Sequence, residues 1–484
     1  MNKNIILCSD GTGNSELKGR GTNVFKLYEA IDRFDSTTPQ IAFYDDGVGT
    51  ESNKYLKMIT GALGIGLSRN ARQLYTHLVH SYTPGDKIYV FGFSRGAYTV
   101  RTLAGFILET GILDREQFNS ESELSHYVNG AYKAYRRKYK TLTSSLWRPL
   151  FGWLTRSTYG FTDLEQIRNR THNDGKAEIQ FIGVWDTVSA LAVPYKVLAD
   201  FIDRFIFKFK FPDNNLHENV SKACHAISID DKRKTFHPEL WNEVNDERNR
   251  IEQVWFAGVH ANVGGGYPKQ GLSLVAMDWM MKKAEGLKFI AQDADYFAEH
   301  ANVHDKLYDS RAGLAAYYPY APRDIYKICR EHGVSPLIHE SVYERSLKLT
   351  EGYAPGNLPV NMQFVSTAGE HVLVDETEKI VSKLGKDTSL LSRVSAWIRL
   401  RQWLQAVFIT LTALAIYLAI KEYSVSAVSQ FLAGDASAGM IVDMIKYLTY
   451  AGVLVPMLIV YGLSGIARRR IQRVYSEFWF TLNK

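Results

Sequence analysis

The chain has 484 residues, of which 46% are hydrophobic and 22% charged, the balance of a folded globular protein. This composition excludes a disordered chain or a collagen-like fibre, and three cysteines are too few for a disulfide-built secreted scaffold. The net charge of +6 is too small over this length to imply nucleic acid, and local basic clusters beside anionic lipid account for it.

The first predicted element is a β-strand over the short apolar run Ile5–Cys8. The run is too short to be the apolar region of a signal peptide. The turn after it contains Asp10, Gly11 and Thr12 and lacks the lysine of a phosphate-binding loop. We expect Gly11 or Thr12 to offer a backbone N–H to an oxyanion and Asp10 to contact substrate. A simple Asx turn at Asp10 is the alternative.

The strongest chemical signal follows a second predicted strand, Ile88–Phe91. Residues 92–96 read G-x-S-x-G, and an apolar, helix-like stretch comes next. A strand, a sharp turn and a helix are the context of a nucleophile elbow. We therefore expect Ser94 to be a nucleophile, Arg95 to donate its backbone N–H to an oxyanion, and Phe93 to contact substrate. A glycine-lined turn with a capping serine is the alternative.

Two stretches that follow mix aromatic with basic residues, at 133–154 and 201–211. They fall in predicted insertions at about 115–175 and 195–250. Such a composition suits contact with an anionic lipid interface or an acyl-chain lid. Ordinary helix packing or a contact within a homo-oligomer explains it equally well.

Two further strands end in partners for a catalytic serine. The run Ile179–Trp185 ends at Asp186, and the run Val254–Val259 ends at His260. The order Ser, Asp, His is that of α/β-hydrolases, and the carboxyl ends of parallel strands meet at one crevice. We expect Asp186 to orient the His260 imidazole, which then acts as the base for Ser94.

Other assignments remain open for these two positions. His225 and His237 compete as bases, but both are predicted to follow helical or polar stretches rather than a strand. Asp186 could instead cap a helix that begins at Thr187.

The C-terminal region contains two uncharged stretches, 403–420 and 447–467, each long enough to cross a bilayer. Buried core helices are the alternative. Arginines flank the outer ends of the pair, whereas the connection between the stretches is slightly acidic. The positive-inside rule therefore predicts a hairpin whose outer ends, with the body at residues 1–385, lie in the cytoplasm. We expect residues 386–484 to anchor the chain in a bacterial inner membrane.

Several motifs together resemble the α/β-hydrolase family that includes type VI secretion phospholipase effectors. The resemblance implies a mostly parallel sheet with helices on both faces, a triad of Ser94, Asp186 and His260, and activity on phospholipid acyl esters. The motifs that carry it lie at residues 10–14, 46–50, 85–86, 92–98, 183–188 and 255–267.

These observations predict a membrane-anchored serine hydrolase, with membrane phospholipid as its substrate and a toxic or antiviral defence role as one setting. Ester hydrolysis by a Ser-His-Asp triad needs no metal or other cofactor. One alternative is a thioesterase or a hydrolase of soluble esters. Another is a non-catalytic scaffold whose hairpin oligomerises or disturbs the membrane.

Overall fold

The computed structural model describes most of the chain. Three predicted features lie outside the described residues, wholly or in large part: Thr12, most of the aromatic and basic stretch 133–154, and all of 201–211. The lid therefore stays a prediction. The described residues are 2–11, 21–47, 66–136, 164–172, 177–189, 214–244, 246–432 and 436–482.

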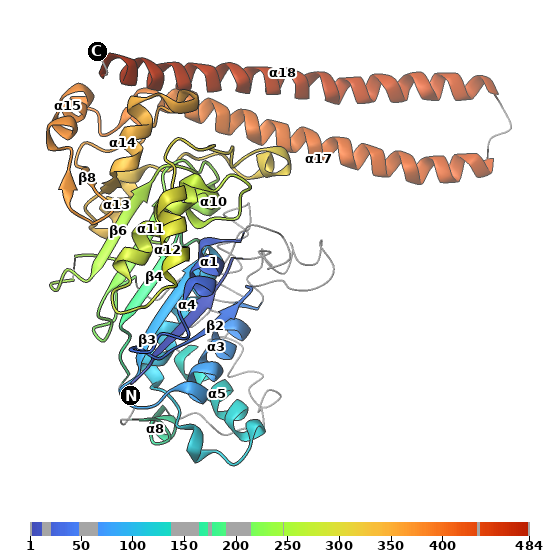
Figure 1. Cartoon of the computed structure of the whole chain (residues 1–484). Coiled ribbons are helices and arrows are strands. Elements are labelled where there is room, and N and C mark those ends of the chain that lie inside the picture. The colour runs from blue at the N-terminus through green and yellow to red at the C-terminus, as the bar shows by residue number, and fades with distance from the viewer. Residues whose placement is uncertain are drawn as a thin grey trace.

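One sheet organises the body (Figure 1). Its strand order in the described chain is β2-β1-β3-β4-β5-β6-β7-β8-β9. Neighbours from β2 to β8 are parallel, and β9 runs antiparallel to β8. The strands are β1 (Asn4–Ser9), β2 (Gln40–Asp45), β3 (Lys87–Phe93), β4 (Phe181–Trp185), β5 (Ala223–Ser228), β6 (Ile251–Phe256), β7 (Leu337–His339), β8 (Gln363–Val365) and β9 (His371–Val372).

Helices cover both faces of this sheet. Ile5 and Leu7 of β1 share a core with α3, α4 and α5, whereas Ile6 and Cys8 share one with α1, α11 and α12. Burial on both faces explains why the strand reads as an unbroken apolar run, and the predicted α/β class is confirmed. The body's α-helices are α1 (Asn23–Ala30), α3 (Leu67–Ser81), α4 (Arg95–Thr110), α5 (Glu121–Arg136), α8 (Leu164–Arg168), α10 (His260–Gly264), α11 (Gly271–Lys283), α12 (Ala291–His300), α13 (Ile325–His332), α14 (Glu340–Leu347), α15 (Val374–Leu384) and α16 (Leu390–Arg393).

The strands predicted to meet at one crevice are close neighbours. In the sheet, β1, β3 and β4 are adjacent, and only β5 separates β4 from β6. Strand β5 (Ala223–Ser228) falls inside the range 195–250 that was predicted to be an insertion. Residues 223–228 thus belong to the sheet itself, and their short run of small and polar residues hid this from the sequence pattern.

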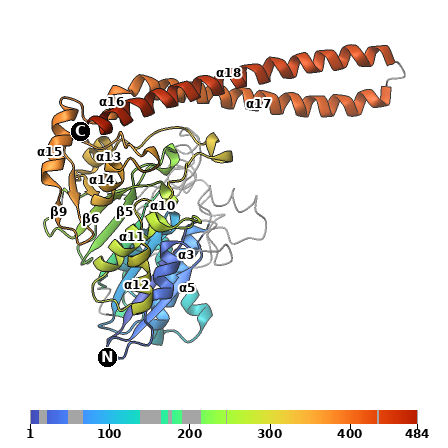
Figure 2. The ribbon, with the colours of Figure 1, turned by 45° about the horizontal axis from the view of Figure 1, so that its top comes forward.

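Two long helices leave the body side by side as an arm, and both views show them (Figures 1 and 2). These helices are α17 (Ser395–Leu432) and α18 (Ala436–Leu482). Within them, Ser395–Ala419 and Ala451–Leu482 are long and apolar enough to cross a membrane, by length and composition alone. Trp403 is 64% exposed and Tyr461 74% exposed, so much of the apolar surface of the arm has no cover in the described chain.

The end of α18 returns to the body. Phe478 and Trp479 are buried in an apolar cluster with residues from β6, α13, α14 and α15. The Trp479 indole donates to the Pro355 carbonyl at 2.9 Å, and Lys383 donates to the Thr481 carbonyl. The predicted anchor region 386–484 therefore includes residues that complete the core of the body.

Candidate active site

Ser94 occupies the sharp turn between β3 and α4. Its φ of 59° and ψ of −121° are strained for a residue with a side chain. The flanking glycines are required by close backbone approach: a Cβ at Gly92 would lie 2.6 Å from the Gly96 carbonyl oxygen, and one at Gly96 would lie 2.1 Å from the Ser9 carbonyl oxygen. This is the strand, turn and helix geometry that the G-x-S-x-G pattern predicts.

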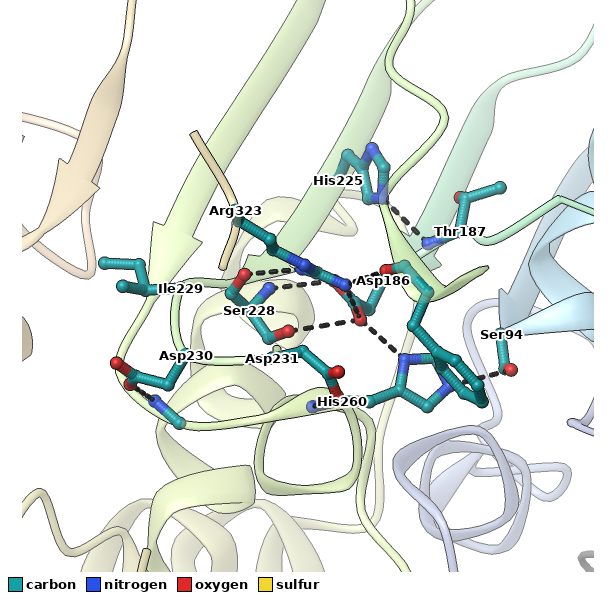
Figure 3. Close-up of polar contacts among 12 residues, drawn as sticks. Ser94, Asp186, Thr187, His225, Ser228, Ile229, Asp230, Asp231, His260 and Arg323 are labelled. Atoms are coloured by element: carbon teal, nitrogen blue, oxygen red, sulfur yellow. Dashed lines mark hydrogen bonds and ion pairs between the residues drawn. The ribbon is translucent and has the colours of Figure 1, made fainter. Parts of the chain in front are cut away.

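His260 lies against this serine. It begins α10, shortly after the end of β6. Its Nε2 is 2.7 Å from Ser94 Oγ, and its Nδ1 is 2.5 Å from Asp186 Oδ2, as Figure 3 shows. The structure thus brings together the three side chains that the sequence proposed as a triad.

Asp186 follows β4 and is fully buried, with a positive φ of 41°. The backbone N–H and the hydroxyl of Ser228 donate to its carboxylate at 2.9 Å and 3.2 Å. Arg323 adds a two-pronged ion pair, with Nη1 2.6 Å from Oδ1 and Nη2 2.9 Å from Oδ2 (Figure 3). Burial alone would raise the pKa of Asp186, but Arg323 and His260 outweigh burial and hold that pKa well below its usual range.

The Arg323 guanidinium also donates to the backbone carbonyls of Ser228 and Phe236. Its side chain is fully buried. One cation therefore joins the carboxylate of Asp186 to two neighbouring segments of the chain. Arg323 and Ser228 were missed by the sequence reasoning, because neither belongs to a recognisable motif.

Aromatic rings enclose the imidazole. The ring of Phe93 lies 4.6 Å from that of His260, and the ring of Phe236 lies 5.0 Å from it. Phe93 is buried beneath the imidazole, so it supports the base; it does not line an open surface. Burial lowers the pKa of His260, although Asp186 acts in the opposite direction, which favours the neutral imidazole that a base requires.

The turn after β1 is held internally. Asp10 accepts hydrogen bonds from the Gly11 N–H at 2.6 Å, from the Thr22 hydroxyl at 2.5 Å and from the Tyr44 hydroxyl at 2.8 Å. This contact joins Asp10 to the next residue, whereas an Asx turn joins the side chain to the N–H two residues on; that residue, Thr12, lies outside the described residues, and the Asx turn stays a prediction. In this conformation the Gly11 N–H serves Asp10, whereas Arg95 stands directly after the serine at the start of α4.

The competing histidines lie elsewhere. His225 is inside strand β5, not after a helical or polar stretch as predicted, and its Nε2 accepts the Thr187 N–H at 3.0 Å. Burial lowers the pKa of His225 to about 3. His237 lies 3.1 Å from the Ala321 carbonyl oxygen. Across the described ranges, no group of three or more His, Cys, Asp or Glu side chains is placed to hold a metal ion.

A comparison with protein families identifies the family of this chain. The family model described as "T6SS, Phospholipase effector Tle1-like, catalytic domain" matches residues 3–283. Uncharacterized protein YEL023C of Saccharomyces cerevisiae is 27% identical over 248 residues, which are 48% of this chain and 32% of the yeast protein. The matched part is thus about a third of that relative's length.

A solved structure is also similar, at greater distance. The crystal structure of an uncharacterized protein from Pseudomonas aeruginosa shares 17% identity, covering 66% of this chain and 50% of that one, with a TM-score of 0.33. This likeness is too remote to carry an argument. The family match covers Ser94, Asp186 and His260, whereas Arg323 and the arm lie beyond it.

Proposed function

We propose that this chain, which belongs to the T6SS Tle1-like phospholipase effector family, is a serine hydrolase that cleaves acyl esters of membrane phospholipid. The family supports the class of substrate. The observation that carries the proposal is the unbroken line of contacts from Ser94 Oγ to His260 Nε2 at 2.7 Å and from His260 Nδ1 to Asp186 Oδ2 at 2.5 Å. A serine, an imidazole and a carboxylate in this order are the parts that acyl transfer uses.

In this mechanism Ser94 attacks the acyl carbonyl carbon while His260 takes its proton. The imidazolium then protonates the departing alcohol, and a water molecule, activated by the same imidazole, releases the acyl group from the serine. Asp186 holds the proton on Nδ1 and stabilises the imidazolium. Arg323 keeps this carboxylate ionised and fixed in place, so that its oxygen stays directed at the imidazole.

The developing oxyanion requires nearby N–H donors. Arg95 is the first candidate, since the backbone amides at the start of α4 adjoin Ser94. The second donor belongs to the turn after β1. Gly11 would first have to release Asp10 in order to donate, and Thr12, the other expected donor, lies outside the described residues.

The arm supports a membrane setting for this chemistry. We assign α17 and α18 as a spanning hairpin, because both are long enough and their large apolar side chains are exposed. The flanking arginines support a body on the cytoplasmic side of that membrane, by the positive-inside rule. Hydrolysis of the bilayer that holds the enzyme would make uncontrolled activity toxic to the cell.

The proposal is tested with full-length protein and phospholipid vesicles, against a short-chain soluble ester and an acyl thioester. We expect the parent to release fatty acid or lysophospholipid from vesicles and Ser94→Ala to release none. Activity on the thioester alone would assign a thioesterase. Membrane damage that persists in Ser94→Ala would assign the scaffold function and overturn the hydrolase.

A further inference from the structure

A cavity of about 420 Å³ lies where the arm meets the body. Four basic side chains line it: Lys232 and Arg311 from the body, Arg401 from α17 and Arg468 from α18. Asp309 is the one acidic residue in its described lining. The cavity therefore has an excess of three positive charges, and none of the proposed triad residues lines it.

The basic groups lie close together, and Asp309 offsets only part of their charge. The guanidinium carbons of Arg401 and Arg311 lie 4.0 Å and 5.2 Å from the centre of the Tyr320 ring. The Nε atoms of both arginines are buried and have no hydrogen-bond partner in the described structure. Arg468 meets Asp309 only at 3.6 Å. Burial lowers the pKa of Arg311 to about 10, and the charges of Arg401 and Arg468 add to this effect. Buried donors beside surplus positive charge call for an anion.

The apolar lining continues from these cations along the arm. Leu404 and Phe408 follow Arg401 by three and seven residues, and Tyr461 and Val460 precede Arg468 by seven and eight. These spacings place the apolar side chains on the same helix faces as the cations, one and two turns farther toward the arm's tip. The cavity is thus cationic at its base and apolar toward the tip.

This polarity matches the proposed membrane placement. Arg401 stands two residues before the uncharged stretch 403–420, and Arg468 follows directly after the stretch 447–467. Both cations therefore sit at the level of the lipid headgroups on the body side, where basic pockets between spanning helices receive anionic headgroups. A free anion would bind the cations, but it would leave the apolar lining of the cavity without a partner.

We propose that this cavity binds one anionic phospholipid of the surrounding bilayer as a non-substrate ligand. The phosphate lies among Arg311, Arg401 and Arg468, and an acyl chain runs along Leu404, Phe408 and Val460. The site rests on the proposed insertion of the arm, but not on the proposed hydrolysis.

The test uses the full chain carrying Ser94→Ala, reconstituted into lipid nanodiscs made of ether-linked lipids that have no acyl ester to cleave. One disc contains phosphatidylcholine, and the other contains equal parts of phosphatidylcholine and phosphatidylglycerol. The readout is the preference of the protein for spin-labelled phosphatidylglycerol over spin-labelled phosphatidylcholine. We expect a clear anionic preference in the parent.

Charge removal then locates the site. Arg468→Gln, whose side chain is 56% exposed, should reduce the preference about tenfold, because a hydrogen bond to a charged group such as the bound phosphate contributes about 1.5 kcal/mol. Adding Arg401→Gln should reduce it further. The matched control is Arg469→Gln with Arg470→Gln, two exposed arginines at the same end of the span that do not line the cavity. The control should keep the parental preference.

Three outcomes would overturn the proposal: no anionic preference in the parent, an equal loss in the control pair, or displacement of the labelled lipid by excess inorganic phosphate, which would assign a soluble anion. Failure of the parent to enter the discs would overturn both the site and the membrane anchor. Loss of lipid preference with intact incorporation would overturn the site alone.

Discussion

The body and the arm use the same kinds of apolar residues in opposite ways. In the body, Trp185, Trp255 and Trp279 are fully buried, whereas on the arm Trp403 is 64% exposed and Leu458 is 70% exposed. A soluble domain has no reason to display such side chains along two helices. The difference indicates that the body covers its own apolar surface, whereas nothing in the described part of the chain covers the arm.

Helix α18 carries both exposed and buried apolar side chains. Its residues near Leu458 are exposed, but Trp479 at its end is 1% exposed and belongs to the core of the body. On its C-terminal side, the division between arm and body therefore falls inside this helix. It also means that the arm and the body are mechanically joined at the arm's base.

The sharpest separation between the two regions is chemical, since all three proposed triad residues belong to the body. Ser94→Ala and His260→Ala should each lower kcat on a soluble ester by about 10⁴–10⁶, because the serine and the imidazole act as one unit. Membrane association and thermal unfolding should remain those of the parent. Retention of more than about a tenth of the activity in either variant would contradict the assignment of Ser94, Asp186 and His260 as a catalytic triad.

A pair of tryptophans tests the contrast in packing. Trp479→Ala should lower the free energy of unfolding by about 3–5 kcal/mol, the usual result of truncating a buried aromatic residue. Trp403→Ala, which removes the same side chain from an exposed position, should change it by less than about 0.5 kcal/mol. Denaturation of both variants in detergent, followed by circular dichroism, gives the comparison. Equal losses would show that the arm is packed against protein.

Removing the outer arm tests what the membrane contributes. Replacing residues 409–459 with a short glycine-serine linker keeps the base of both helices and the Trp479 contact. This variant should match the parent on a soluble ester and lose about 10²-fold on vesicle lipid, because tethering raises the effective concentration of substrate.

The matched control is truncation at residue 390, which also removes Trp479 and should therefore unfold the body. Parallel losses on both substrates in the linker variant would instead assign the outer arm a structural role. Equal rates on vesicle lipid would show that tethering contributes nothing.

The sequence predicted the parts of the site that stand at strand ends. Ser94, Asp186 and His260 each follow an apolar run, and strand-end positions on a parallel sheet converge by topology. Ser228 and β5 escaped prediction because ACHAIS carries too few large apolar residues to read as a strand. Arg323 escaped because it reaches Asp186 across 137 residues from a loop without a motif.

The contacts of individual side chains also could not be predicted from the sequence. The turn at Asp10 has the composition of an oxyanion wall and of an Asx turn alike, and the sequence does not reveal that the Gly11 N–H donates to Asp10. Likewise, Phe93 adjoins the serine in sequence, yet its ring packs beneath His260. Strand alternation fixes which face such a side chain takes, but not what it meets there.

The smallest expected effect concerns Arg323, a buried cation that connects the site to the part of the chain beyond the family match. The parent's kcat/KM on a soluble ester should rise with pH through a midpoint below about 6.5, the ordinary value for histidine, because burial lowers the pKa of His260 and only the neutral imidazole accepts the proton. Arg323→Met leaves Asp186 without its counter-charge. The unshielded carboxylate then favours the imidazolium, raises the pKa of His260 and moves the acid limb to higher pH, while kcat falls about tenfold.

Arg323→Lys separates this electrostatic effect from simple loss of fold. Lysine restores the positive charge without the two-pronged geometry, so its acid limb should return toward the parental midpoint while kcat stays reduced. Removing one member of a buried ion pair costs about 3–5 kcal/mol of stability, and the lysine variant keeps the test usable if the methionine variant does not fold. An Arg323 that only braces the fold would lower activity equally at every pH and leave the midpoint unmoved. That result would show that Arg323 supports the triad by packing alone.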